Sequence, residues 1–285
     1  MIPRIAIITD TDSSIPLSIS KSLGIMQVPI MINFDDESFA AAEEIDDAQV
    51  FSRIDATGKL PKTSAPSPGQ FAEAYAQAFQ SGADSVICFC VSGEVSATYS
   101  SAVSARELTP HLDITVIDTR SLSMAFGYMV LEAAQAAREG ATKAEIISRA
   151  NSVKDRSHLF AALSTLKYLV MGGRVSQLTA GFASVLSVKP ILTIRDGKLD
   201  VLERVRTQSK AFDRVVELSK QAAGGKDIQQ LCIVHVNALE AAQAFAQLLR
   251  QSLTYPLEVL YIELTPGLSI HSGAGLVGVC FVTSS

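Results

Sequence analysis

Val86-Ile87-Cys88-Phe89-Cys90-Val91-Ser92-Gly93 is the stretch that decides the fold, because an uninterrupted apolar run leads directly into a polar loop. A short apolar run bounded by turn residues is typical of a strand that is buried on both faces. A helical pattern follows, with Tyr99, Ala102 and Val103 on one face. The order of strand, polar loop and helix predicts one unit of a parallel sheet covered by helices.

The same order recurs on both sides of this unit. The apolar runs Arg4–Thr9 and Ile114–Ile117 each end at a polar loop that precedes a helical stretch, and Ile25–Ile32 is a further apolar run. Ligands of parallel sheets bind beyond the carboxyl ends of the strands. We therefore expect the polar loops to gather at one edge of the sheet, namely those after Thr9, before Ser67, after Val91 and after Ile117.

The pattern changes from about Leu159. Asp196-Gly197 lies between two alternating runs, which predicts a hairpin. Further strands are expected at 231–236, 257–264 and 277–282, with a helix at 238–253 between the first two. The predicted fold class is α/β with two domains. Residues 1–158 form a mostly parallel sheet flanked by helices, and residues 159–285 form an α/β domain with a mixed sheet.

Composition limits the classes of function. The chain has 285 residues, of which 48% are hydrophobic and 19% charged, and its net charge is −5. It has no apolar stretch long enough for a membrane span, and the apolar N-terminus reaches Asp10 too soon for a signal peptide. The protein is therefore expected to be cytoplasmic, without stable membrane insertion. Basic residues form no long runs, so nucleic acid is not an expected partner.

Two loops carry hydroxyl groups just before predicted helices. They are Thr63-Ser64-Ala65-Pro66-Ser67-Pro68-Gly69, which ends in a capping-box signature with Gln70, and Ser92-Gly93-Glu94-Val95-Ser96-Ala97-Thr98-Tyr99. Free N–H groups at a helix start favour an anion, so the two loops together suit a carboxylate or a phosphate. The alternative is that each loop is an ordinary helix cap.

His271 is the histidine most suited to contact such an anion. It opens His271-Ser272-Gly273-Ala274-Gly275, between two apolar strands, where Gly273 and Gly275 permit close backbone approach. His271 is expected to donate a hydrogen bond directly or through water. A structural role is an equally open interpretation. The four cysteines sit in or beside apolar runs and are interpreted as buried hydrophobic residues, so no metal or other cofactor is expected.

Asp10-Thr11-Asp12 after an apolar strand permits an alternative, a phosphatase in which Asp10 attacks phosphorus and Asp12 acts as acid and base. That chemistry also needs a downstream acidic pair to close a Mg²⁺ site. Asp35-Asp36 and Asp46-Asp47 follow no clear strand end. The simpler interpretation is that Asp12 and Ser13 organise the turn into the first helix.

Taken together, these loops resemble the DegV family of bacterial fatty-acid-binding proteins over nearly the whole chain. Any one motif is weak, and their order and spacing are specific. The segments that carry the resemblance are Thr9–Pro16, Thr63–Pro68, Ser96–Ala102, Asp118–Gly127, Leu166–Leu169, Gly172–Ser176, Lys189–Leu192 and His271–Gly275. Three of their residues depart from the family pattern, where Ala65 replaces Gln, Ala97 replaces Gly and Ala274 replaces Pro. The turn Asp12–Ile15 also departs from its usual form, which leaves a ligand role for Ser13 open.

The resemblance implies a DegV-type, Rossmann-like fold with a long-chain fatty acid such as palmitate, stearate or oleate held between the two domains. Its carboxylate would meet Thr63, Ser96 and His271. Weaker candidate contacts are Ser64, Thr98, Ser272 and Gly273. The chain would be a carrier without enzymatic activity of its own. It would present the acid to a separate fatty acid kinase for acyl-phosphate formation and phospholipid synthesis, with Arg206 in the docking surface and Arg174 and Arg204 as further candidates.

Two other functions stay open beside the carrier and the phosphatase. A hydrolase would use Ser96 with His271, although the chain has no Gly-x-Ser-x-Gly elbow around Ser96 and no clear third partner for the histidine. A lipid-sensing regulatory module would share the carrier's pocket and differ only in its partner. Neither the chain length nor the unsaturation of the acid follows from the sequence.

Overall fold

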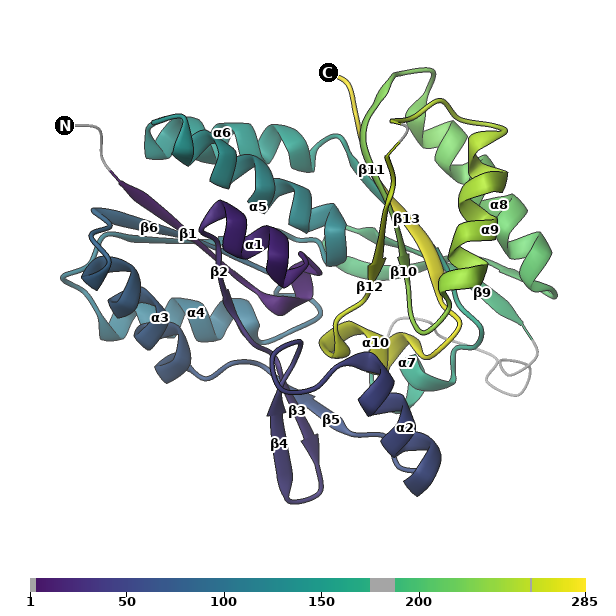
Figure 1. Ribbon diagram of the computed structural model, residues 1–285, viewed down its shortest axis with the longest axis horizontal. Helices are drawn as coiled ribbons and strands as arrows, with labels where there is room; N and C mark the ends of the chain where they lie inside the picture. Colours follow the sequence, from purple (N-terminus) through teal and green to yellow (C-terminus); the bar gives the residue numbers. More distant parts are fainter. Residues whose placement is uncertain (1–3, 175–187, 257) are drawn as a thin grey trace.

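The computed structural model describes residues 4–174, 188–256 and 258–285. Figure 1 shows two halves side by side, with the N-terminal strands in one half and β8 to β13 in the other. Val175 and Ser176, at the end of the Gly172–Ser176 segment that carries part of the family resemblance, lie outside the described residues.

The first half is built on a parallel sheet in the order β2-β1-β6-β7. These strands are Met26–Val28, Ile5–Asp10, Ser85–Cys90 and Ile114–Asp118. Every residue of β6 is buried, as its continuous apolar run predicts. The helices on the two faces are α1 (Leu17–Leu23), α5 (Ser123–Arg138) and α6 (Lys143–Lys154) on one side, and α3 (Pro68–Gln80) and α4 (Thr98–Leu108) on the other.

A small antiparallel sheet, β4-β3-β5, projects from this half and was not predicted. Its strands are Met31–Phe34 (β3), Glu37–Ala40 (β4) and Lys62–Ser64 (β5), with α2 (Asp47–Thr57) between the last two. The apolar run Ile25–Ile32 is divided between β2 and β3 around Pro29, which has no N–H to donate to a strand ladder. Strands this short give little alternation in sequence. The sheet matters for the site because Thr63 lies in β5, opposite Ile32.

The second half contains a six-stranded mixed sheet in the order β10-β9-β8-β13-β11-β12, in which only β11 and β12 run parallel. In that order the strands are Lys198–Val205, Lys189–Arg195, Ser157–Ala162, Val277–Thr283, Ile228–His235 and Leu260–Glu263. The Asp196-Gly197 hairpin is confirmed, and both residues have positive φ angles of 51° and 82°. The α/β fold class with one parallel and one mixed sheet is therefore confirmed.

The two faces of the mixed sheet have different neighbours. Helices α8 (Gln208–Ala223) and α9 (Leu239–Arg250) cover one face, where Phe160 and Phe245 belong to one hydrophobic core. The other face belongs to the same hydrophobic core as α5. The division into domains 1–158 and 159–285 stays a prediction, and the start of the mixed sheet at β8 supports a boundary near this point.

Three short helical segments lie where the halves meet. They are η1 (Thr11–Ser13), which follows β1, together with α7 (Lys167–Met171) and α10 (Pro266–Ser272). Helix α10 contacts α7, α2, β3 and η1. Thr265 Oγ1 donates a hydrogen bond of 3.0 Å to the carbonyl of Thr11, which ties the start of α10 to η1. Residues from both halves are thereby brought to one region.

Candidate ligand-binding site

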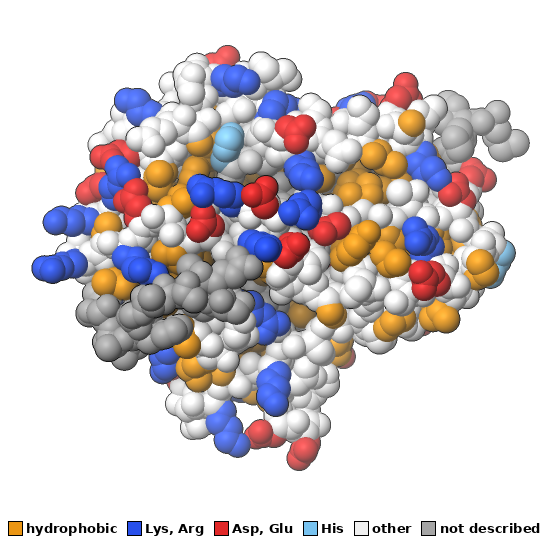
Figure 2. Space-filling view, turned by 180° about the vertical axis from the view of Figure 1, so that it is seen from behind, with side chains coloured by type: hydrophobic (Ala, Val, Ile, Leu, Met, Phe, Trp, Pro, Cys, Tyr) orange, Lys and Arg blue, Asp and Glu red, His pale blue; other side chains and the backbone are white. Residues whose placement is uncertain are grey.

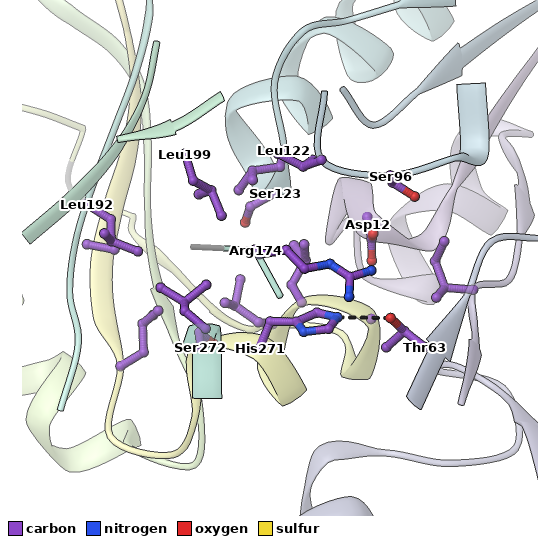
Figure 3. Close-up of a pocket in the computed structure, with 18 of the residues that line it drawn as sticks. Asp12, Thr63, Ser96, Leu122, Ser123, Arg174, Leu192, Leu199, His271 and Ser272 are labelled. Atoms are coloured by element: carbon purple, nitrogen blue, oxygen red, sulfur yellow. Dashed lines mark hydrogen bonds between the residues drawn. The ribbon is translucent and has the colours of Figure 1, made fainter. Parts of the chain in front are cut away.

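A cavity of about 250 Å³ lies between the carboxyl edge of the parallel sheet and the inner face of the mixed sheet. Figure 3 shows Asp12, Thr63, Ser96, Arg174 and His271 toward one end of the cavity and Leu192 and Leu199 toward the other. Its polar lining residues are Asp12, Thr63, Ser64, Ser96, Ser123, Arg174, His271 and Ser272. Its larger apolar lining residues are Ile30, Val95, Leu122, Leu159, Leu169, Leu192, Leu199, Val234, Leu264, Leu268 and Leu276. The loops expected to gather after β1, before α3, after β6 and after β7 all contribute to it.

Thr63 and His271 meet at the polar end of the cavity. Thr63 Oγ1 lies 2.9 Å from Nε2 of His271, within hydrogen-bonding distance. His271 does not lie in a glycine-rich loop, as the sequence suggested, but in the last turn of α10. Thr265 at the helix N-cap and Pro266 in its first turn are the sequence signals for this helix.

The imidazole of His271 is neutral over the physiological pH range. Burial and the nearby charge of Arg174 lower the pKa of His271 to about 4. Nδ1 is buried and has no hydrogen-bond partner within the described part of the chain. Gly172, at the end of α7, packs against this nitrogen so closely that a Cβ there would overlap it. The ring is therefore held by packing on one side and by Thr63 on the other.

Ser96 lines the cavity but does not cap α4 in the expected way. The helix begins at Thr98 with Ala97 as its N-cap residue, and that cap has no side-chain hydrogen bond. Ser96 Oγ lies 2.8 Å from Thr98 Oγ1 and accepts a 3.3 Å hydrogen bond from the Thr98 N–H. Thr98 is buried and does not line the cavity, so its contribution is to orient the hydroxyl of Ser96.

The other candidate residues differ in their relation to the cavity. Ser64 and Ser272 line it, and the Ser64 hydroxyl accepts a hydrogen bond from Asn33 Nδ2 at 3.1 Å. Gly273, with a φ of 80°, packs against the ring of Tyr168 and does not line the cavity. Arg206 is exposed in the turn between β10 and α8, also outside the lining.

Two charged lining residues were not identified as ligand candidates from the sequence. Arg174 was grouped with Arg204 and Arg206 as a docking residue, whereas its side chain reaches into the polar end of the cavity (Figure 3). Asp12 was interpreted as a turn residue, and it lines the same end. Asp12 lies two residues after the end of β1, and this position beside a strand end was the available signal.

Asp10 stabilises the loop after β1 through hydrogen bonds to its carboxylate. One carboxylate oxygen accepts the N–H of Asp12 at 2.9 Å, and the other accepts the N–H of Val91 at 2.8 Å. These bonds join the ends of β1 and β6. Asp10 is fully buried and lies outside the cavity lining, and burial raises its pKa to about 7.

The described residues contain no cluster of three or more histidine, cysteine or acidic side chains that would hold a metal ion. Within the same residues, no helix is both long and apolar enough to cross a membrane. On the face seen in Figure 2, lysine and arginine side chains are interspersed with acidic ones. All four cysteines are buried, as predicted.

Comparison with known proteins identifies one family. A family model described as an uncharacterised protein of the DegV family matches residues 4–284. A DegV domain-containing protein of Caldanaerobacter subterraneus subsp. tengcongensis is 34% identical over 278 residues, which is 98% of each chain. A DegV family protein from Thermus thermophilus, described by its fatty acid binding, has a TM-score of 0.91 at 28% identity, covering 99% of this chain and 100% of the other. DegV of Bacillus subtilis, described as a fatty acid binding protein, has a TM-score of 0.88 at 27% identity with the same coverage.

Proposed function

This chain belongs to the DegV family, and from that premise we propose that it binds a long-chain fatty acid in the cavity between its two sheets. The observation that carries the proposal is the hydrogen-bonded Thr63 and His271 pair at one end of a cavity whose other lining is mainly leucine. An amphiphile with one small polar head and an unbranched apolar chain matches this division. The fatty acid binding described for the Thermus thermophilus and Bacillus subtilis relatives supports the same ligand.

Thr63, Ser96 and His271 are proposed to bind the carboxylate. A buried carboxylate without partners costs several kcal/mol, so its site needs converging donors. When Nε2–H of the neutral His271 donates to Thr63 Oγ1, the threonine hydroxyl is free to donate to the ligand. Ser96 supplies a second hydroxyl. Ser64 and Ser272 are proposed as further contacts, whereas Thr98 and Gly273 would act through Ser96 and through packing on Tyr168.

The apolar lining would hold the acyl chain. A fatty acid of the size of palmitate or stearate has roughly 15 methylene groups, and their burial would contribute on the order of 12 kcal/mol before ordering costs. Leu159 and Ala161 on β8, Leu192 on β9 and Val234 on β11 present an apolar wall from the mixed sheet. The tail would therefore lie along this sheet, with the head at the carboxyl edge of the other.

We further propose that the chain is a cytoplasmic carrier that presents the fatty acid to a separate kinase for phospholipid synthesis. The kinase would transfer the γ-phosphoryl group of ATP to the carboxylate, giving an acyl phosphate and ADP. The chain itself would supply no catalytic group. Arg206 suits a docking role because it is exposed and lies outside the cavity, so its replacement would leave ligand binding intact.

Charge reversal tests the docking role. Arg206→Glu is expected to bind fatty acid like the wild type and to slow acyl-phosphate formation by a cognate kinase at least about tenfold, as for loss of a charged interface contact. Lys21→Glu, an equal charge change at an exposed site on α1, is the matched control. Equal rates for all three proteins would refute the role of Arg206.

The enzymatic alternatives have less geometric support. The phosphatase would need Asp10 as an accessible nucleophile, whereas both of its oxygens accept backbone N–H groups in a fully buried position. The hydrolase would need Ser96 hydrogen-bonded to His271, but Ser96 bonds Thr98 while His271 bonds Thr63. A lipid-sensing module would use the same cavity as the carrier and differ in its protein partner.

Extraction of the purified protein separates these possibilities. The protein is extracted with organic solvent, and the lipid is identified and quantified by mass spectrometry. The expected result is close to one fatty acid per chain, reduced in Thr63→Val. A purified protein that is free of lipid and does not take up added oleate would contradict the binding proposal. Mg²⁺-dependent phosphatase activity lost in Asp10→Asn would favour the phosphatase.

A further inference from the structure

Asp12 is a buried acidic residue at the polar end of the cavity that the proposed carboxylate site does not use. It is only 5% exposed and lines the cavity together with Thr63, Ser96 and His271. Its Oδ1 is buried and makes no hydrogen bond within the described residues. Figure 3 shows Asp12 on the same side of the cavity as Ser96 and Thr63, with the Arg174 side chain extending toward it. This oxygen packs against Gly267, while the residue lines the cavity, so a ligand head group there lies next to a carboxyl group that makes no side-chain hydrogen bond within the described residues.

The position of Asp12 is fixed by its surroundings. Its N–H donates to Asp10, and the neighbouring Thr11 accepts the N–H of Ile30 through Oγ1 at 3.0 Å and the Thr265 hydroxyl through its carbonyl. Gly267 of α10 provides the space, because a Cβ at that position would overlap Oδ1 of Asp12. The backbone at Asp12 is therefore held by contacts from Asp10 at the end of β1, from Ile30 and from the start of α10.

The charges around Asp12 favour its neutral form. Among the described residues, Asp10 on β1 and Arg174 after α7 are the charged groups that act on Asp12, and His271 on α10 lines the same cavity, while the packed start of α5 contributes no titratable side chain. Burial and then the charge of Asp10 raise the pKa of Asp12 well above its usual range, and Arg174 acts in the opposite direction. Asp10 accepts two backbone N–H groups, which act to lower its pKa, so a negative charge is better stabilised on Asp10 than on Asp12.

We propose that Asp12 is a further binding residue, which donates a hydrogen bond as a neutral carboxylic acid to the carboxylate of the bound fatty acid. This inference rests on the proposed function. Ligand and protein then share one proton between two carboxyl groups. Where Asp12 is ionised in the ligand-free protein, binding takes up one proton from solvent.

Calorimetric titration with oleate tests the proposal. The affinity and the number of protons taken up are measured between about pH 6 and about pH 9, in buffers with different ionisation enthalpies. In the wild type, proton uptake is expected to rise from near zero toward one per ligand as the pH passes through the pKa of ligand-free Asp12, and the dissociation constant is expected to increase with pH only above that point. Asp12→Asn retains a donor that does not titrate, so its affinity is expected to be nearly independent of pH and its proton uptake close to zero.

Two further variants complete the design. Asp12→Ala removes the donor and is expected to bind oleate at least about tenfold more weakly than Asp12→Asn at the lowest pH. Asp55→Asn is the matched control, an equal charge change at an exposed residue of α2, and should reproduce the wild-type pH profile. Parallel pH profiles for the wild type and Asp12→Asn, or unchanged affinity in Asp12→Ala, would overturn the role of Asp12 alone. Absence of oleate binding to the wild type at every pH would instead overturn the proposed function and this inference with it.

Discussion

Thr63 and His271 are 208 positions apart in the sequence, and one hydrogen bond joins their side chains. If these residues bind the ligand carboxylate together with Ser96, then Thr63→Val, Ser96→Ala and His271→Ala will each weaken fatty acid binding. Loss of a hydrogen bond to a charged group corresponds to about 1.5–3 kcal/mol, or roughly a tenfold to hundredfold change in dissociation constant. Displacement of a fluorescent fatty acid measures the effect.

Ser100→Ala is the matched control for these variants. Ser100 lies on α4 close to Ser96 in sequence, but its hydroxyl is exposed and donates to the carbonyl of Ala97 outside the cavity lining. It should bind like the wild type, and thermal unfolding should show that all four variants fold. Retention of wild-type affinity by the three cavity variants would remove the basis for the head-group assignment.

At the scale of elements, the contact between the end of α7 and α10 positions His271. Gly172 has a φ of −77°, which alanine adopts without strain, so Gly172→Ala tests the steric contact alone. The added methyl group would displace the imidazole from Thr63. We expect at least about tenfold weaker fatty acid binding, similar to loss of the hydrogen bond itself. Gly69→Ala on α3, where the added group meets only ordinary contacts, is the control. Equal affinities for the two variants would show that the α7 contact does not orient the ring.

A second contact between elements joins α2 to α10 and predicts a pH dependence of stability. The Ser269 hydroxyl donates to Asp47 Oδ1 at 2.5 Å, and the other oxygen is buried without a partner in the described chain. Burial raises the pKa of Asp47 to about 7, against the lowering effect of the Ser269 hydrogen bond. The folded state therefore binds more protons than the unfolded state between about pH 4 and about pH 7, so the free energy of unfolding contributed by Asp47 falls as the pH rises.

Asp47→Asn removes this titration and keeps an acceptor for Ser269. Urea unfolding at several pH values should show its stability relative to the wild type improving by on the order of 2 kcal/mol from about pH 4 to about pH 8. Other titrating groups affect both proteins equally and cancel in the comparison. The role of Asp47 would be refuted by two stability curves that run parallel across this range.

At the scale of the whole molecule, side chains on the inner face of the mixed sheet would limit the length available to the proposed acyl chain. Ala161 is 5% exposed on β8, near the middle of the mixed sheet, and lines the cavity. In Ala161→Leu, the larger side chain would occupy space for about three methylene groups, or roughly 2 kcal/mol of burial. Stearate should bind about tenfold to fiftyfold more weakly, while laurate binding changes little. An equal effect on both acids would show that the far end of the acyl tail does not lie against Ala161.

The sequence by itself determined the features that depend on neighbouring residues. The apolar run of β6, the Ser67 and Gln70 capping box and the Asp196-Gly197 hairpin follow from local hydrophobicity and backbone preference, and all are found in the structure. The strand order then brought the polar loops to one edge, because parallel strands end on the same side. These features were sufficient to predict the α/β class and to single out the polar loops, while the resemblance to the DegV family implied Thr63, Ser96 and His271 as the carboxylate contacts.

Only the tertiary structure decided which side chains share the cavity. Burial of Asp12 depends on Gly267, 255 positions away, and the low pKa of His271 depends on burial and on Arg174. The sheet that holds Thr63 arises from strands too short to show a pattern. Desolvation and charge interactions depend on the distance between groups in space. The separation of two residues along the chain does not give that distance. The sequence alone therefore could not show that the charged side chains of Asp12 and Arg174 line the same end of the cavity.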